Sequence, residues 1–235
     1  MKTKQRMLTG DRTTGKLHLG HYVGSLQNRV ALQDRYETFI LLADVQALTT
    51  HANHPQRSAQ SIYDVAMDNL AAGLNPDTVC FVQQSQVPAI AELTVFYSML
   101  VSVNVLRHNP TIKTEAKQYG YSELTYGFLG YPVSQAADIT FCKADLVPVG
   151  DDQLPHLELS RKLVRRFRER YGADFLHVPK PLLSRTPRLA GLDGSGKMSK
   201  SLGNAIDLSD DAATVRQKVR SAITDARRIA MTDKG

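Results

Sequence analysis

The side chains best suited to phosphate chemistry lie in two glycine-flanked segments that are far apart in the sequence. The first, residues 9–21, contains three glycines and two histidines, His18 and His21. Glycine lets the backbone approach a ligand closely, and amides at a helix start attract phosphate. Both histidines can then point toward one anion. One alternative is a glycine-rich turn with a single capping histidine. Another, a P-loop, fails because Leu17 follows Gly15-Lys16 where serine or threonine is required.

The second segment, residues 194–201, carries Lys197 and Lys200 in a loop rich in glycine and serine. A mobile loop of this kind can close two ammonium groups over a polyphosphate and open again to release product. Taken alone, this segment is better explained as an ordinary exposed loop. The chain shows no Ser-His-Asp pattern. Catalysis is therefore expected to rest on positioning and electrostatic stabilisation rather than on a protein nucleophile.

The elements that must position these segments alternate along the chain. Strands are predicted over residues 5–9, 38–43, 79–83 and 146–149, and helices over 21–35, 58–74, 90–103, 126–141, 152–171 and 210–223. Short apolar strands between helices predict an α/β fold with a parallel sheet and helices on both faces. Ligands bind such sheets at the carboxyl ends of the strands.

Several local features refine this prediction. Asp152 is predicted as the N-cap and Gly172 as the stop of the helix over 152–171. Residues 126–141 are predicted to contain a helix, in which Pro132 is tolerated if it lies in the first turn, where a missing N–H costs nothing. Residues 173–204 are rich in proline and glycine and are predicted to be loop.

Composition excludes several classes of protein. The chain has 235 residues, of which 42% are hydrophobic, and no apolar run reaches the roughly 18 residues that a membrane helix needs. The N-terminus lacks the apolar core of a secretory signal. Two cysteines without a CxxC spacing exclude a disulfide scaffold or a cysteine zinc site and favour a reducing cytosol. Both Cys80 and Cys142 are expected in the core.

Charge is distributed unevenly. Residues 1–160 carry 12 Lys+Arg and 15 Asp+Glu, a net of −3, whereas residues 161–235 carry 17 and 8, a net of +9; the sum is the overall +6. A basic C-terminal third favours a polyanionic partner. The alternative is an exposed arginine-rich helix. The run from Arg161 to Arg170 is interpreted in that second way, as stabilising its own helix end and surface.

Taken together, the two phosphate-type segments resemble a known family. His18-Leu19-Gly20-His21 resembles the HIGH signature, and Lys197-Met198-Ser199-Lys200-Ser201 matches the KMSKS signature, of class I aminoacyl-tRNA synthetases. Three further segments, 44–49, 131–139 and 147–161, resemble the tryptophanyl-tRNA synthetases among them. The resemblance extends over about residues 5–225 and implies a Rossmann-like catalytic domain.

The resemblance implies a role for each matching residue. His18, His21, Lys197 and Lys200 are expected to contact the phosphates of ATP and to stabilise charge as pyrophosphate leaves. The rest of the nucleotide site is expected to comprise Gly10, Asp11, Arg12, Thr13, Thr14, Gly20, Gly150, Asp151, Asp152, Leu189, Met198, Ser199 and Ser201. The residues expected around tryptophan are Leu8, Tyr131, Gln135, Asp138 and Gln153, with Asp138 accepting a hydrogen bond from the indole N–H. Mg²⁺ is expected to arrive bound to ATP, so neither a permanent cofactor nor a protein metal site is predicted.

The implied reaction is activation of L-tryptophan by ATP and transfer to tRNA(Trp), in a cytoplasmic homodimer without membrane contact. Residues 1–205 are predicted to form the catalytic domain. Residues 206–235 are predicted to begin a helical tRNA-binding and anticodon-binding domain whose remainder is absent, so weak charging of tRNA is expected.

Three positions depart from the commonest bacterial pattern and indicate a divergent branch: Asp11-Arg12-Thr13, Gln135 and Leu202-Gly203-Asn204. The alternatives left open are a tyrosyl enzyme and a truncated paralogue that binds adenylate or a partner without charging tRNA. A third is another HxGH nucleotidyl transferase, such as a cofactor adenylyltransferase, which the five-residue KMSKS match disfavours.

Overall fold

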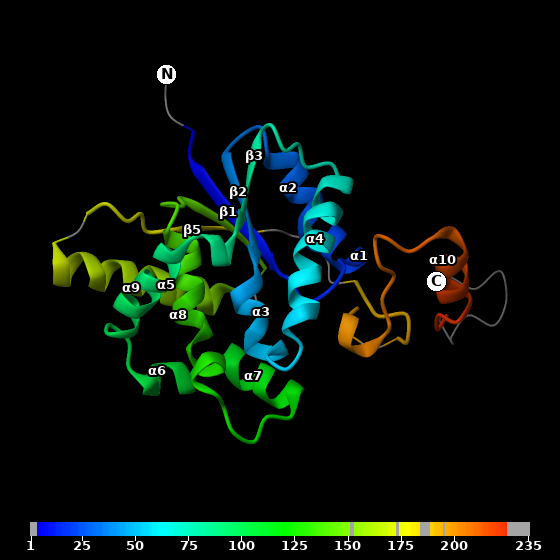
Figure 1. Ribbon diagram of the computed structural model, residues 1–235. Coiled ribbons are helices and arrows are strands. Elements are labelled where there is room, and N and C mark those ends of the chain that lie inside the picture. Colours follow the sequence, from blue (N-terminus) through cyan, green and yellow to red (C-terminus); the bar gives the residue numbers. More distant parts are fainter. Residues whose placement is uncertain (1–3, 151–152, 173, 184–188, 195, 225–235) are drawn as a thin grey trace.

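A parallel sheet forms the centre of the computed structural model, which describes residues 4–150, 153–172, 174–183, 189–194 and 196–224 (Figure 1). Its strands are β1 (Arg6–Arg12), β2 (Glu37–Ala43), β3 (Val79–Gln83), β4 (Leu146–Val149) and β5 (Lys180–Leu183), in the order β3-β2-β1-β4-β5. All of these pairings are parallel. The predicted α/β class is therefore confirmed.

The strand order creates a switch point between β1 and β4. β1 pairs with β2 along its whole length, but it pairs with β4 only where Met7 meets Leu146. Since the two strands stop pairing beyond that point, their carboxyl ends leave space between them. This is where parallel sheets of this kind bind ligands.

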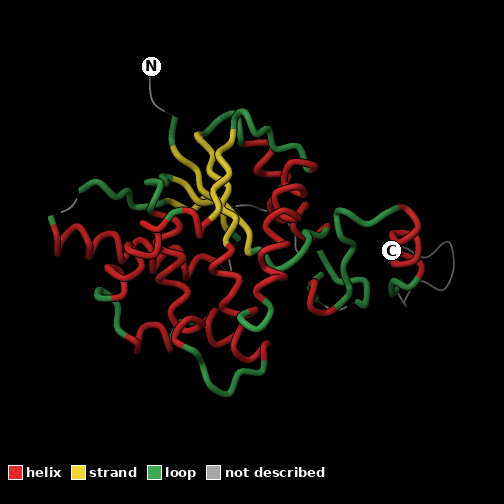
Figure 2. Tube along the Cα trace, in the orientation of Figure 1, coloured by secondary structure: helices red, strands yellow, loops and turns green. Residues whose placement is uncertain are grey.

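Helices cover both faces of the sheet (Figure 2). They are α1 (Leu19–His21), a π-helical turn (Tyr22–Leu26), α2 (Gln27–Leu32), α3 (Asp44–His51), α4 (Pro55–Ala71), α5 (Pro88–Ser98), α6 (Val103–Arg107), α7 (Pro110–Tyr119), α8 (Tyr126–Thr140), α9 (Leu154–Tyr171) and α10 (Ala212–Arg220), with short 3-10 turns at Gln84–Gln86 and Lys200–Leu202. Side chains of β2 alternate between the faces. Leu41 and Ala43 join an apolar cluster with α5, α8 and α9, whereas Ile40 and Leu42 pack on the side of α2 and α4. Burial on both faces explains the continuous apolar run in this strand.

The sequence predicts four of the five strands and misses the fifth. The strands over 79–83 and 146–149 are confirmed, while β1 continues three residues past its predicted end, through Arg12. The prediction that 173–204 is entirely loop is wrong, because β5 lies within it at the sheet edge, where Pro181 is tolerated. The helix predicted over 90–103 ends at Ser98, and α3, α6 and α7 were not predicted.

Two helix details also differ from expectation. Pro132 lies well inside α8 rather than in its first turn, so the Phe128 carbonyl loses its usual helical donor. The helix continues because most of its residues from 131 to 140 are buried. In α9 the N-cap is Gln153, without a side-chain bond, while the predicted cap Asp152 lies outside the described residues. Gly172 ends that helix with φ 62°, as predicted.

Candidate active site

A cleft of about 330 Å³ lies at the carboxyl ends of β1 and β4. Its walls also include parts of β2, α3, α7, α8 and the start of α9. All residues predicted to surround tryptophan line this cleft: Leu8, Tyr131, Gln135, Asp138 and Gln153. Gly10, Asp11 and Arg12 from the predicted nucleotide site line it as well. The structure therefore brings the two predicted binding sites together in one place.

One face of α8 supplies most of the polar groups of the cleft. Tyr131, Gln135 and Asp138 stand at spacings of four and three residues, which places them on the same side of a helix. Because α8 packs on the sheet and on α5 and α9, these side chains are held by a rigid element. Such support suits a site that must distinguish between similar ligands.

Asp138 is the buried carboxyl group of the cleft, with 4% of its surface exposed. Burial raises the pKa of Asp138 to about 7, and the negative charge of Asp44 adds to this effect. A hydrogen bond from Gln84 Nε2 to Asp138 Oδ1, 2.7 Å long, acts in the opposite direction. Gln84 is not among the residues predicted from the sequence, since it belongs to none of the recognised segments.

Tyr131 is also held by a buried partner. Its hydroxyl lies 2.9 Å from Nε2 of His156, a fully buried residue of α9, and burial raises the pKa of Tyr131. The ring packs edge-on against Phe128. Tyr131 is thereby fixed at the wall of the cleft, uncharged at neutral pH.

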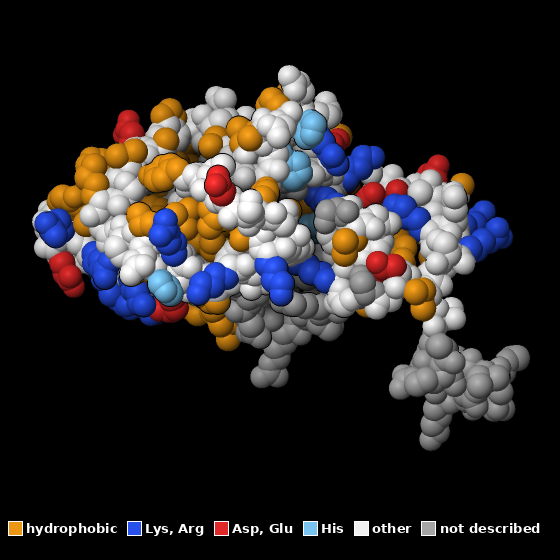
Figure 3. All heavy atoms as spheres, turned by 90° about the horizontal axis from the view of Figure 1, so that it is seen from below, with side chains coloured by type: hydrophobic (Ala, Val, Ile, Leu, Met, Phe, Trp, Pro, Cys, Tyr) orange, Lys and Arg blue, Asp and Glu red, His pale blue; other side chains and the backbone are white. Residues whose placement is uncertain are grey.

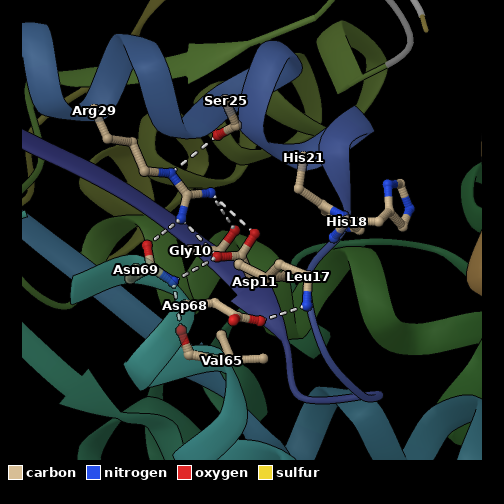
Figure 4. Close-up of polar contacts among 10 residues, drawn as sticks. All are labelled: Gly10, Asp11, Leu17, His18, His21, Ser25, Arg29, Val65, Asp68 and Asn69. Atoms are coloured by element: carbon tan, nitrogen blue, oxygen red, sulfur yellow. Dashed lines mark hydrogen bonds and ion pairs between the residues drawn. The ribbon is translucent and has the colours of Figure 1, made fainter. Parts of the chain in front are cut away.

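The histidine pair lies at the start of the helix that follows β1 (Figure 4). His18 is the N-cap and accepts a hydrogen bond from the Gly20 amide through Nδ1 at 3.0 Å, while His21 Nδ1 accepts from the His18 amide at 3.2 Å. A Cβ on Gly20 would stand 2.8 Å from the His18 ring, so glycine is required there. Part of the HxGH pattern is thus a helix cap.

Both histidines are neutral in this arrangement. Burial lowers the pKa of His18 to about 4 and that of His21 to about 3, and the positive charge of Lys200 acts in the same direction. The ring centroids lie only 3.9 Å apart. An anion placed beside them would favour their charged forms.

Asp11 forms a buried ion pair at the end of β1 (Figure 4). Its two carboxylate oxygens accept from Arg29 at 2.5 and 3.0 Å, and Asn69 and Ser25 bond the same guanidinium group. Burial alone would raise the pKa of Asp11, but the charge and hydrogen bonds of Arg29 outweigh it and hold the pKa at about 2. Both carboxylate oxygens of Asp11 are bonded to Arg29. The predicted contact of Asp11 with ATP stays a prediction.

Gly10 has a structural reason to be glycine besides its place in the cleft. A Cβ there would meet the Leu41 carbonyl oxygen at 2.4 Å on the neighbouring strand. Of the turn that follows, Thr13 is fully buried, and the Thr14 amide bonds to the Arg12 carbonyl at 2.9 Å. The conformation of this loop is therefore set largely by its own packing.

The KMSKS segment lies against the HxGH loop. Lys200 Nζ donates to the Gly15 carbonyl oxygen at 2.7 Å, and burial lowers the pKa of Lys200 to about 8. Met198 is buried, and its amide bonds to the Leu189 carbonyl at 2.9 Å, whereas Lys197 is exposed. Figure 3 shows Lys, Arg and His side chains gathered where this part of the chain meets the main body. The two phosphate-type segments are thus adjacent, as predicted.

Asn204 organises the inside of this segment. Its Oδ1 accepts from the Ser199 amide at 2.8 Å, and its Nδ2 donates to Asp193 at 2.9 Å and to the Lys197 carbonyl at 3.3 Å. Gly191 packs so closely that a Cβ there would stand 2.1 Å from Asn204 Nδ2. The departure from the common pattern at this position therefore has a structural role.

Other predicted residues are placed as follows. Gly150 is exposed after β4, while Asp151 and Asp152 lie outside the described residues, and for Ser201 only the backbone is described. Within the described residues, no group of three or more His, Cys, Asp or Glu side chains could hold a metal ion. No helix in that part of the chain is long and apolar enough to cross a membrane.

The cysteine prediction is half right. Cys142 is buried, but Cys80 on the edge strand β3 is exposed. Three residues of the arginine run do something other than the predicted support of their own helix end: Arg161, Arg166 and Arg168 donate to the carbonyls of Pro179, Leu100 and Leu176, all outside α9. Those arginines fasten α9 to neighbouring segments.

The fold and the two adjacent signatures define a nucleotide-binding α/β enzyme of the class I aminoacyl-tRNA synthetase type. Over residues 1–234 the chain matches the family described as tRNA synthetases class I (W and Y). It is 54% identical to the tryptophan–tRNA ligase of Streptococcus pneumoniae, over 99% of this chain and 70% of that protein, and equally so to that of Streptococcus mutans.

Solved structures agree with this result. The tryptophanyl-tRNA synthetase of Campylobacter jejuni complexed with ADP and tryptophan superposes with a TM-score of 0.85 at 29% identity, covering 94% of this chain and 68% of that one. A tyrosyl-tRNA synthetase of Archaeoglobus fulgidus complexed with L-tyrosine gives 0.79 at 27% identity, covering 95% and 66%. The chain belongs to the class I tRNA synthetases for tryptophan and tyrosine and is an aminoacyl-tRNA ligase.

Proposed function

We propose that this chain works as a tryptophan–tRNA ligase, which activates L-tryptophan with ATP and transfers it to tRNA(Trp). The observation that carries this proposal is the convergence of five predicted tryptophan contacts on one cleft, which is also lined by Gly10, Asp11 and Arg12 of the strand that precedes the HxGH helix. The curated relatives at 54% identity bear the same name. A buried carboxyl group at Asp138 suits the indole N–H, which is a donor only.

The first half-reaction needs positioning and charge stabilisation. The carboxylate of tryptophan attacks the α-phosphorus of ATP, a carboxyl oxygen–phosphorus bond forms, and the bond to the departing pyrophosphate breaks. No protein side chain needs to act as nucleophile or base. Lys200, Lys197, His18 and His21 are the groups that we assign to the phosphates, and charge on the leaving group is what such donors stabilise.

Lys200 has a particular advantage for this role. It is held in the site by a hydrogen bond to the Gly15 carbonyl, and burial has already lowered its pKa to about 8. The phosphates of ATP supply negative charge that restores the full ammonium charge. Since Lys200 is partly shielded from water, its attraction for phosphate is stronger than that of an exposed lysine.

We assign ATP to the chain as its Mg²⁺ complex. The residues at the phosphate side are histidines, lysines and backbone amides, which suit phosphate oxygens rather than a cation. Mg²⁺ bound by the phosphates and water fits that environment, because this ion usually keeps most of its water. It neutralises charge on the polyphosphate.

We further propose a cytoplasmic homodimer. α5, α6 and the residues between them expose Val95, Phe96, Met99, Val103 and Val105, an apolar surface of the kind that a second subunit covers. Free thiols at both cysteines fit a reducing compartment. Sedimentation of the purified chain tests the dimer directly.

Amino-acid-dependent ATP–pyrophosphate exchange, measured with each of the twenty amino acids, tests the proposed activity. Exchange is expected with tryptophan and at most weakly with the others. Exchange with tyrosine instead would establish the tyrosyl alternative. Adenylate formation without transfer to tRNA(Trp) would support the paralogue that does not charge tRNA.

A further inference from the structure

A buried chain of hydrogen bonds leads from α3 to the cleft. Gln84 donates from Nε2 to Asp138 Oδ1 at 2.7 Å and accepts on Oε1 from the backbone amide of Gln46 at 2.9 Å. Gln84 and Asp138 are each 4% exposed. Both ends of the Gln84 amide are thus occupied away from bulk water, so this side chain has one position only.

The orientation of that amide follows from its partners. The backbone N–H of Gln46 can only donate, so the side-chain oxygen of Gln84 must face it and the side-chain NH₂ group of Gln84 must face Asp138. Gln46 is the third residue of α3, where an amide has no partner within its own helix. Gln84 therefore uses a spare donor of the helix start to fix its own direction.

We infer that Gln84 is the positioning residue of tryptophan recognition: it holds one oxygen of Asp138 so that the other oxygen faces the indole N–H. This inference rests on the proposed function. Asp138 lines the cleft, and among the described residues no protein hydrogen bond reaches its second oxygen. The free oxygen is then presented in one direction, as recognition of a single N–H requires.

The same bond controls the charge of Asp138. Burial and the charge of Asp44 favour the neutral acid, and the donor on Gln84 favours the carboxylate. A neutral acid would hold its proton on one oxygen and compete as a donor with the indole. Titratable groups on the surrounding elements are Asp44 on α3, Tyr97 on α5, Glu115 on α7, Tyr131 on α8, His156 on α9, and Asp11 and Arg12 across the cleft on β1.

The test compares Gln84→Met with Gln83→Met. Gln83 is the adjacent residue, and its amide bonds to Asp44 and Ser85 at 2.9 Å each without touching Asp138. Both variants remove two hydrogen bonds at the end of the same strand. Since the chain contains no tryptophan, the fluorescence of the ligand itself reports binding. The dissociation constant of L-tryptophan is measured from pH 5.5 to 9 for each protein, together with that of an analogue whose ring carries sulfur in place of N–H.

In the unchanged protein, tryptophan binding should weaken as the pH falls through about 7. Gln84→Met should weaken binding at pH 7.5 by about tenfold or more and move the midpoint upward by about one pH unit, the effect of losing a hydrogen bond to a charged group. The preference for tryptophan over the N–H-free analogue should fall by a similar factor. Gln83→Met should leave all three quantities close to those of the unchanged protein.

Equal pH midpoints and equal analogue preference in the two variants would overturn the role of Gln84. If Gln84→Met does not fold, as judged by its melting curve, Gln84→Glu keeps the shape and the Gln46 bond but loses the permanent donor. Its tryptophan affinity at pH 8 should again fall at least about tenfold, and an unchanged affinity would overturn the inference. Failure of the unchanged protein to prefer tryptophan over the analogue would instead contradict the proposed function.

Discussion

The amino-acid side and the phosphate side of the cleft are held in different ways. Tyr131 and Asp138 stand on a helix packed into the main apolar cluster, and each has a buried side-chain partner, His156 and Gln84. The KMSKS segment belongs to a stretch with little regular structure. Lys200 of this segment bonds to the HxGH loop at Gly15, and the residues that follow the segment add backbone bonds from Leu19 to Ile206 and from Leu208 to Leu17.

This difference matches two different demands. Selection of one amino acid needs groups that do not move, because a small displacement lets a competitor fit. Release of pyrophosphate needs contacts that can break without unfolding a core. Changes on the amino-acid side should therefore alter selectivity, and changes on the phosphate side should alter rate.

The largest effect is expected at Asp138. Asp138→Ala should abolish most of the preference for tryptophan over phenylalanine, because a site built to bond a substrate N–H can reject analogues lacking it by about 10⁴. The measurement is kcat/KM for both amino acids in pyrophosphate exchange. Selectivity retained in this variant would place recognition elsewhere in the cleft and contradict the assignment of selectivity to the groups on α8.

Lys200→Ala should lower kcat of adenylate formation by about 10²–10³, the usual loss for one donor to transition-state charge. The KM for tryptophan should change little, because Lys200 belongs to the phosphate side. Single-turnover adenylate formation gives both values. Normal kcat with weaker ATP binding would remove the assigned role.

The buried ion pair between Asp11 and Arg29 tests how the start of the phosphate side is supported. Arg29→Met leaves a buried carboxylate and should cost about 3–5 kcal/mol of unfolding free energy. The double variant Arg29→Met/Asp11→Leu should recover much of this loss. Urea unfolding measures each; an equal loss in the double variant would argue against an isolated charge as the cause.

Acid dependence should reveal the buried carboxyl group. The pKa of Asp138 is about 7 in the folded chain and about 4 when unfolded. Between these values the folded state binds more protons, so stability falls as pH rises from 4 to 7. The unfolding free energy of the unchanged protein minus that of Asp138→Asn should therefore fall over that range, and a pH-independent difference would contradict the raised pKa.

Asn204→Ala should have the smallest effect on stability, about 1 kcal/mol, since the segment it organises lies outside the main core. It should nevertheless lower kcat, because the backbone around Lys197 and Ser199 loses its internal support. Asn204→Asp keeps the acceptor for Ser199 but places a carboxylate beside Asp193, so its kcat should fall at least as far as that of Asn204→Ala. A normal kcat in Asn204→Ala would show that the loop is ordered by its other contacts.

The sequence predicted the inner strands, the parallel class and the members of the cleft, because continuous apolar runs and family signatures are local features. It missed β5, where Pro181 hides an edge strand, and it did not show that a helix continues through Pro132, whose cost is offset by the packing of α8. Gln84 carried no signal, since a lone glutamine after a short strand matches no pattern. Its role depends on Asp138, 54 positions further along the chain.

The functional groups of the site can be identified without a structure: a pair of histidines, a lysine loop and a carboxyl group, each in a recognisable local pattern. The charge state of each group, and whether it is available to a substrate, depend on the folded chain. Asp11 is bound by Arg29, and the histidines are neutral because they are buried near Lys200. Asp138 is oriented by Gln84. Charge and direction depend on burial and on distant partners, and these exist only once the chain is folded.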